Sequence, residues 1–423
     1  MSTREPSTAT LRARLLPLYA AVGLQGFSLW VPVEKLFMNE IGFDAAAVGV
    51  MAAAYAAFVP LVEVPSGILA DRWSRRGVIA LASGALALTA LIGGLSTNVP
   101  MYIVSALVLG VYFAMYSGTM DAIVYDTVVE ETGGSACFER IIGRVRLAES
   151  VTLVASSLAG GWIANLATPR LTYYLTAPFA VLSIVALFRF REPSLHKTEE
   201  PVPLRHQLAL TYRTLLRNRS LLPTVVLAVL TALIMQTVFE FGPLWLVALS
   251  VPAVAYGPYW AGLVSTLGLG GLLAGRLPLE RRGAIGAAAA LMLLAAGTLA
   301  VSSNVPAVMI AQVTLLMLVA MAGIHVTRRL HDAVPSTVRS GVASGVGAIS
   351  WITFLPFALG AGHVTDTYGV HSTGGMITVV ATVTGLLWIA VAVRRSARPA
   401  PSAATLEPTH GEPPECVPAL TVS

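Results

Sequence analysis

Long apolar runs, separated by short polar stretches, recur along almost the whole chain of 423 residues. A helix needs about 20 apolar residues to cross the hydrocarbon core of a bilayer, which is about 30 Å thick. Runs of this length predict an all-α integral membrane protein with twelve transmembrane helices in two sets of six. The predicted helices span residues 15–36, 46–70, 78–97, 100–125, 143–166 and 171–189, then 221–248, 255–275, 283–302, 306–327, 338–361 and 373–393.

Three polar segments flank and separate the two sets. Residues 1–14 precede the first set, and residues 190–220 form a linker that contains Pro193, Pro201 and Pro203. Residues 394–423 are rich in Pro, Ser, Ala and Thr and have no apolar face, which predicts a disordered tail. We therefore expect two six-helix bundles, at 15–189 and 221–393.

The composition agrees with lipid as the main solvent, because 56% of residues are hydrophobic and 12% are charged. A net charge of +5 could indicate nucleic-acid binding, but the arginines lie between apolar runs without interleaved aromatic residues. We therefore expect no nucleic-acid partner.

The basic residues predict the orientation in the membrane, because Lys and Arg accumulate in cytoplasmic loops. With both termini in the cytoplasm, Lys35 and Arg170 are the two of 27 basic residues that fall outside. We therefore expect a multi-pass protein of the cytoplasmic membrane.

Two patterns recur in the second set of helices. The sequence from Gly67 to Arg72 is echoed from Gly271 to Arg276, an offset of 204 residues. Gln25 precedes Pro32 by seven positions, and Gln236 precedes Pro243 by the same distance. Each repeat has six helices, and an even number of spans returns the chain to the same side of the membrane. The sequence therefore predicts two parallel repeats related by an axis along the membrane normal.

The loop after the second predicted helix carries a motif. The stretch Pro65-Ser-Gly-Ile-Leu-Ala-Asp-Arg-Trp-Ser-Arg-Arg-Gly77 resembles the signature loop of the major facilitator superfamily, except that Ser74 replaces a glycine. The resemblance implies a secondary transporter in which Asp71, Arg75 and Asp126 close the cytoplasmic mouth as a latch. A generic interfacial ion pair is the alternative. The motif residues assigned to the latch with Asp126 are Gly67, Asp71, Arg72, Arg75 and Arg76.

Carboxylates at membrane depth are candidates for proton or substrate binding, because a charge at a helix centre costs about 2.5 to 3.5 kcal/mol. Glu240 is the strongest candidate, since Gly242 and Pro243 predict a bend beside it. Glu149 lies three residues after Arg146 and is expected to form a structural ion pair. The candidate acids are Glu34, Glu63, Asp121 and Glu240.

Cavities in the superfamily are lined by the first, fourth, seventh and tenth helices, which implies a set of cavity candidates in this chain. An aromatic residue in a span is otherwise a core or lipid-facing residue. Few polar groups among the candidates favour an amphiphilic organic substrate over a sugar or phosphate. The cavity candidates on these helices are Gln25, Trp30, Tyr116, Gln236 and Phe241, and Trp351 on the eleventh helix adds aromatic surface.

The chain has no ATP-binding P-loop, because that motif requires a lysine after a glycine and neither of the two lysines, Lys35 and Lys197, follows one. Direct use of ATP is therefore not expected. The resemblance implies that an ion or solute gradient drives transport. We therefore expect a monomeric, proton-coupled exporter of a drug or natural product, without metal or cofactor. Alternatives are an importer or facilitator of a small metabolite, or a membrane enzyme that uses His325, His331 and Asp332.

Overall fold

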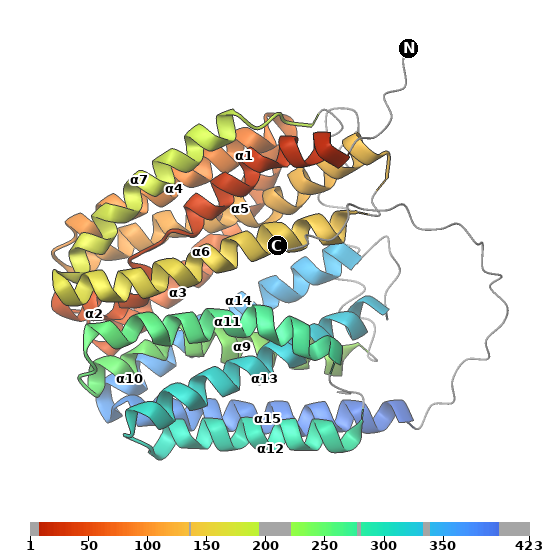
Figure 1. Ribbon diagram of the computed structural model, residues 1–423. Helices are drawn as coiled ribbons and strands as arrows, with labels where there is room; N and C mark the ends of the chain where they lie inside the picture. Colours follow the sequence, from red (N-terminus) through yellow and green to blue (C-terminus); the bar gives the residue numbers. More distant parts are fainter. Residues whose placement is uncertain (1–7, 135–136, 194–220, 277–280, 333–338, 397–423) are drawn as a thin grey trace, which may run out of the picture.

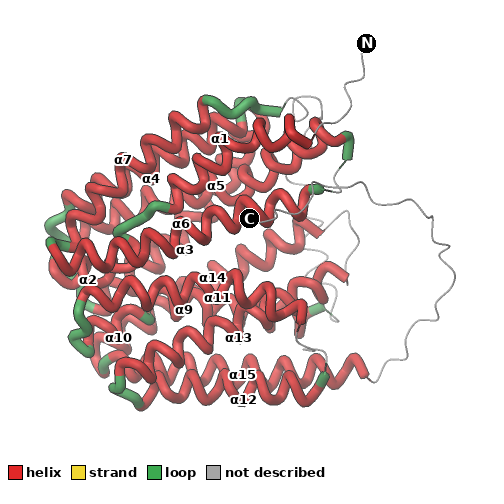
Figure 2. The backbone as a smooth tube through the Cα atoms, in the orientation of Figure 1, coloured by secondary structure: helices red, strands yellow, loops and turns green. Residues whose placement is uncertain are grey.

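The computed structural model describes residues 8–134, 137–193, 221–276, 281–332 and 339–396, and over these residues it contains helices and no strands (Figures 1 and 2). The first group of elements is α1 (Thr8–Gly26), η1 (Val31–Val33), α2 (Glu34–Glu40), α3 (Ala45–Arg72), α4 (Arg75–Leu95), α5 (Val99–Thr132), α6 (Phe138–Leu166) and α7 (Pro169–Phe188). The second group is α9 (Leu222–Phe241), α10 (Pro243–Ala248), α11 (Ala253–Arg276), α12 (Arg282–Val301), α13 (Val305–Asp332), α14 (Arg339–Tyr368) and α15 (Val370–Ser396).

Eleven segments of the described chain are long and apolar enough to cross a membrane. Large apolar side chains such as Leu61, Leu294 and Leu386 are exposed, which suits contact with lipid. The helix α11 is the one long helix of the two groups that is not among the eleven segments. Its glycines and its Tyr and Trp residues make it less apolar, and Tyr256 and Tyr259 are buried between helices.

Local sequence explains where several helices begin and end. The Asp44 carboxylate accepts a bond from the amide of Ala47 and caps α3. Asn98 caps α5 in the same way, and α5 ends at Gly133, whose φ of 72° places it in the left-handed region. Ser74, the residue that departs from the signature motif, caps α4 by accepting a 2.8 Å bond from the amide of Gly77. The serine that replaces the glycine of the motif therefore stabilises the start of α4.

The two groups of helices lie against each other at the end that contains α2 and α10 and diverge toward the other end (Figure 1). We call these the α2 end and the Arg75 end, after the residue that begins α4. Helix α3 packs on α14, and α6 packs on α11. Small residues let helices of membrane proteins approach closely, and here glycines near the α2 end have that position.

Two glycine pairs permit the closest approach between the groups. A Cβ added to Gly49 would lie 2.9 Å from the Cα of Gly362. A Cβ added to Gly161 would lie 2.6 Å from the backbone nitrogen of Gly257.

Two helices are broken near the α2 end. The prediction of one continuous helix over 15–36 is wrong: α1 stops at Gly26, a short loop follows, and η1 begins beside Pro32 (Figure 2). The bend predicted at Gly242 and Pro243 is confirmed, because α9 ends at Phe241 and α10 begins at Pro243. Proline lacks the amide hydrogen that a continuing helix needs, so the repeated Gln-x6-Pro pattern marks both breaks.

Aromatic side chains join the two groups at the α2 end. Trp30, Phe37 and Tyr173 of the first group form one buried cluster with Phe241 and Phe354 of the second group. The rings of Trp30 and Tyr173 stack with centroids 5.2 Å apart. The two groups are therefore joined at the α2 end by a packed aromatic core.

Candidate functional site

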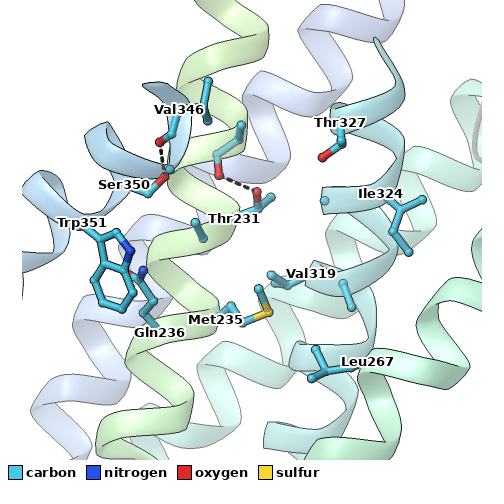
Figure 3. A pocket seen from close by; sticks show the side chains of 15 residues that line it. Thr231, Met235, Gln236, Leu267, Val319, Ile324, Thr327, Val346, Ser350 and Trp351 are labelled. Carbon is cyan, nitrogen blue, oxygen red and sulfur yellow. Dashed lines mark hydrogen bonds between the residues drawn. The ribbon is translucent and has the colours of Figure 1, made fainter. Parts of the chain in front are cut away.

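A cavity of about 540 Å³ lies in the second group, between α9, α11, α13 and α14 (Figure 3). Its wall is mostly apolar and includes Met235, Leu267 and Val319. Gln236 and Trp351, both predicted as cavity residues, are in the lining. Among the described residues that line this cavity, none carries an ionisable side chain.

Two hydroxyl groups in the cavity wall, those of Thr231 and Ser350, donate to their own helices. Thr231 Oγ1 donates to the carbonyl of Ala228 at 2.8 Å, and Ser350 Oγ donates to the carbonyl of Val346 at 2.9 Å (Figure 3). The Gln236 Oε1 atom is buried and accepts no hydrogen bond from the described residues. The hydrogens of the Thr231 and Ser350 hydroxyl groups are therefore already used within their own helices.

Trp351 connects the cavity to the first group of helices. Its ring centroid lies 5.8 Å from that of Tyr55 on α3. It also lies 6.4 Å from the centroid of Phe354, which belongs to the aromatic cluster at the α2 end. A movement that separates the two groups at that end would therefore alter a wall of the cavity.

A buried ion cluster lies across the two groups near the α2 end. Lys35 Nζ on α2 donates to Glu240 Oε1 on α9, and it lies 3.2 Å from Glu34 Oε2. The side chain of Lys35 is 1% exposed, against 25% for Glu240. Tyr102 donates to Glu34 Oε1 at 3.1 Å. The cluster thus links an ammonium group of the first group to a carboxylate of the second.

The broken helices position this cluster. Glu34 and Lys35 begin α2 directly after η1, whereas Glu240 lies in the last turn of α9, before the break at Pro243. Both breaks therefore lie within a few residues of the charged side chains that meet at the contact between the groups. Discontinuous helices commonly form substrate and ion sites in transporters.

A second charged cluster belongs to the first group alone. Arg146 on α6 donates to Asp121 Oδ1 on α5 at 2.7 Å and to Glu149 Oε2 at 3.3 Å. The ion pair predicted for Glu149 and Arg146 is therefore present. Asp121, one of the predicted proton or substrate candidates, is therefore paired with Arg146. Glu63 has an exposed side chain on α3.

Part of the predicted latch is assembled at the Arg75 end. Arg75 Nη1 pairs with Asp126 and donates to the carbonyl of Ala122 at 3.1 Å, so it ties the start of α4 to α5. Arg76 Nη1 donates to the carbonyl of Phe190 at 3.0 Å. Arg72 is exposed, and the side chain of Asp71 lies outside the described part of the structure.

Gly67, the first residue assigned to the latch, is exposed, and among the described residues a Cβ added to it would meet nothing within 4 Å. The close glycine contacts between α3 and α14 that the structure describes lie nearer the α2 end.

Four predicted cavity residues are packed between helices and do not line the cavity. Gln25 is 3% exposed and donates to Ser83 Oγ at 2.7 Å. Tyr116 is 3% exposed and stacks on Tyr112 with ring centroids 5.4 Å apart. Trp30 and Phe241 belong to the aromatic cluster at the α2 end. Evenly apolar helices give no sequence signal for which face borders a cavity.

Lys35 is the residue that sequence reasoning missed. Lys35 and Arg170 were the two basic residues that the predicted orientation places outside the cytoplasm. In the structure both side chains have partners within the protein. Arg170 donates to the carbonyl oxygens of Gly94 and Ser96, at the end of α4. The available signal was the rarity of lysine, since the chain has two, together with the acidic neighbour Glu34.

The architecture agrees with comparisons to known proteins. The Major Facilitator Superfamily model matches residues 15–360, so the chain belongs to this superfamily. Multidrug resistance protein 1 of Bacillus subtilis (strain 168) is 26% identical over 199 residues, 47% of this chain and 49% of that protein. Multidrug resistance protein 2 of the same organism is 28% identical over 189 residues, 44% of each chain. The matches thus span less than half of these relatives.

A solved structure gives an independent match to the fold. The nucleoside transporter NupG has a TM-score of 0.72 and 14% identity, with 92% of this chain and 100% of that chain covered. At this identity the likeness concerns the fold alone. The superfamily and the apolar spans together define a multi-pass protein of the cell membrane.

Proposed function

We propose that the protein is a proton-coupled exporter of a small amphiphilic organic molecule, working by alternating access. In this proposal the chain has twelve spans, which are the eleven apolar segments together with α11. They form two bundles, at residues 15–189 and 221–393. The α2 end faces outward and the Arg75 end and both termini face the cytoplasm, as the distribution of basic residues favours.

The contact between Lys35 and Glu240 is the single observation that carries the proposed mechanism. It joins the two groups at the outer end, so that end stays closed while the pair persists. The two groups diverge at the other end, where Arg75 and Asp126 lie (Figure 1). This arrangement is the inward-facing state, in which the substrate enters from the cytoplasm.

Charge in the ion cluster supports proton coupling. With Glu34, Lys35 and Glu240 all ionised, the cluster carries one net negative charge in a site largely screened from water. One proton brings it to neutrality. A proton on Glu240 removes the charge that Lys35 pairs with, which weakens the outer contact and allows that end to open. Ionised Glu240 then belongs to the inward-facing state, after proton release to the cytoplasm.

The direction of transport follows from this order of events. The state that has released its proton exposes the apolar cavity of the second group to the cytoplasm, so substrate replaces the proton there. The likeness to two multidrug resistance proteins supports export. The apolar cavity wall supports an amphiphilic substrate.

Transport in inverted membrane vesicles tests the proposal. A pH-sensitive dye inside respiring vesicles should report alkalinisation when a transported aromatic antibiotic or dye is added, because substrate entry is coupled to proton exit. Glu240→Gln should abolish this signal at matched protein abundance. Glu40→Gln is the control, because Glu40 lies on α2, the helix that carries Lys35, but is exposed.

Two outcomes would contradict the proposal. Proton-linked transport that survives in Glu240→Gln would remove the ion cluster from the coupling mechanism. Uptake in right-side-out vesicles, driven by an inward proton gradient, would identify an importer.

A further inference from the structure

Two carboxylates share one ammonium group in the ion cluster at the α2 end. Glu34 Oε2 lies 3.2 Å from Lys35 Nζ, and Glu240 Oε1 accepts a hydrogen bond from the same nitrogen. A proton on either carboxylate would neutralise the cluster, so the net charge does not decide which of the two acids binds it. The other contacts of the two carboxylates decide it.

A chain of two tyrosine hydroxyl groups ends on Glu34. Tyr102 Oη on α5 donates to Glu34 Oε1 at 3.1 Å and lies 2.6 Å from Tyr173 Oη on α7. An ionised carboxylate only accepts hydrogen bonds, so Tyr102 gives its hydrogen to Glu34, and the hydrogen between the two hydroxyl groups comes from Tyr173. Both tyrosines are buried, where chained hydrogen bonds strengthen one another. Both oxygen atoms of Glu34 therefore face a donor, Tyr102 on one side and Lys35 on the other.

Glu240 lacks a comparable second donor. Among the described residues, Lys35 is the one side chain that donates to it. Its side chain is 25% exposed, against 17% for Glu34, so water reaches it at least as well. Tyr55 on α3 lies near both carboxylates and forms a hydrogen bond with neither. Hydrogen bonds to the ionised form disfavour protonation, so a proton is less costly on Glu240 than on Glu34.

We infer that Tyr102, oriented by Tyr173, keeps Glu34 ionised and thereby assigns the coupling proton to Glu240. The inference rests on the proposed function, because it concerns the proton of that mechanism. Tyr102 is a positioning residue, since it acts through Glu34 and does not itself exchange the proton. The two acids then have separate tasks. Glu34 retains Lys35 when the α2 end opens, and Glu240 binds and releases the proton.

Two variants that each retain one of the acids test the inference. Glu34→Gln retains Glu240, Glu240→Gln retains Glu34, and Lys35 is present in both proteins. Infrared difference spectra of the full chain in lipid nanodiscs, recorded from neutral to acidic pH, follow the C=O stretch of the protonated carboxyl group. Subtraction of the spectra of a variant that lacks both acids isolates the band of the retained one. We expect the midpoint of Glu240 to lie about one pH unit or more above that of Glu34, which is a tenfold difference in proton affinity.

Removal of the tyrosine hydroxyl should affect the two acids differently. Tyr102→Phe keeps the ring, which packs edge-on against Phe43 with centroids 5.5 Å apart. A hydrogen bond to a charged group changes the proton affinity of that group by about tenfold or more. In the protein that retains Glu34, Tyr102→Phe should therefore raise the midpoint by about one pH unit. In the protein that retains Glu240, it should leave the midpoint unchanged.

Two more tyrosine variants support this comparison. Tyr173→Phe removes the hydroxyl that orients Tyr102, so it should raise the midpoint of Glu34 by a smaller amount. This variant leaves Tyr102 intact and keeps the test valid if Tyr102→Phe does not fold. Tyr256→Phe is the control, because the Tyr256 hydroxyl is buried and has no hydrogen bond with the described residues. It should move neither midpoint.

Three results would overturn the inference. Equal shifts of both acids in Tyr102→Phe would mean that the hydroxyl supports the packing of the α2 end and does not distinguish the acids. A midpoint of Glu34 at or above that of Glu240 would place the proton on the wrong acid. A midpoint of Glu34 that neither Tyr102→Phe nor Tyr173→Phe raises would show that the tyrosine chain does not keep Glu34 ionised.

The infrared titration distinguishes this inference from the proposed function, because it needs neither a proton gradient nor a substrate. If the selective shift of Glu34 is observed while proton-linked transport is absent in vesicles, the proposed function fails and the assignment of the proton to Glu240 stands. If transport depends on Glu240 but the tyrosine variants move neither midpoint, the inference fails alone.

Discussion

Replacement of Lys35 by methionine should open the α2 end. Methionine keeps an unbranched side chain of similar size but removes the ammonium group that Glu34 and Glu240 share. In the closed state both carboxylates then lose their counter-charge, whereas in the open state water solvates them. Lys35→Met therefore destabilises the closed state relative to the open one.

The size of this shift follows from the burial of the cluster. Removal of one partner from a buried ion pair costs about 3 to 5 kcal/mol. Because the carboxylate side chains of Glu34 and Glu240 are 17% and 25% exposed, we take the lower value, about 3 kcal/mol. This value corresponds to roughly a hundredfold shift of the equilibrium toward the open state.

Spin-label distances across the α2 end measure the shift. Asn165 at the end of α6 and Val301 at the end of α12 are exposed and belong to different groups of helices. Labels attached to cysteines there, with Cys137 and Cys416 replaced by serine, should move apart in Lys35→Met. Lys35→Met combined with Glu240→Gln should restore much of the short-distance population, since it removes an unmatched carboxylate. An unchanged distance distribution in folded Lys35→Met protein would show that the ammonium group of Lys35 does not hold the α2 end closed.

Three further changes test other parts of the structure. Gly161→Val places a side chain where a Cβ would lie 2.6 Å from the backbone of Gly257, so we expect the labelled α2 end to widen and proton-linked transport to fall at least tenfold. Asp126→Asn removes the partner of Arg75, and we expect transport to fall severalfold at normal abundance, with a cysteine at the Arg75 end becoming more reactive from the cytoplasmic side. Ser74→Ala removes the cap of α4 and a 2.6 Å bond to Glu192, so the apparent thermal transition in detergent should fall, by about 1 kcal/mol of stability, whereas Ser74→Asn should retain most of it.

The helical architecture could be predicted because lipid imposes a strong pattern on sequence. Every span must satisfy its backbone hydrogen bonds internally, so apolar runs report helices directly. The bend at Pro243 was predicted from proline chemistry. The break before Pro32 was missed although the same Gln-x6-Pro pattern occurs there, because the surrounding run is apolar throughout and reads as one helix.

The functional site was harder to predict, because it depends on contacts between distant segments. Glu240 was selected as a candidate from its place beside a bend, but its partner Lys35 is 205 positions away and was interpreted as an outer-loop residue. Gln236 and Trp351 were assigned to the cavity, and the structure places them there. Gln25, the repeat counterpart of Gln236, is instead bonded to Ser83. The repeat relates backbone positions, and the packing of each group decides which side chain is exposed.

The effect of pH on the α2 end tests the central claim most directly, because it links proton binding to opening without a known substrate. The distance between labels at Asn165 and Val301 is measured in nanodiscs from neutral to acidic pH. If a proton on Glu240 opens this end, the long-distance population should rise as the pH falls in the otherwise unaltered protein and in Glu40→Gln. Glu240→Gln should start with a larger open population and lose most of the pH response. An unaltered protein that does not respond to pH, or a Glu240→Gln variant that responds as the unaltered protein does, would contradict it.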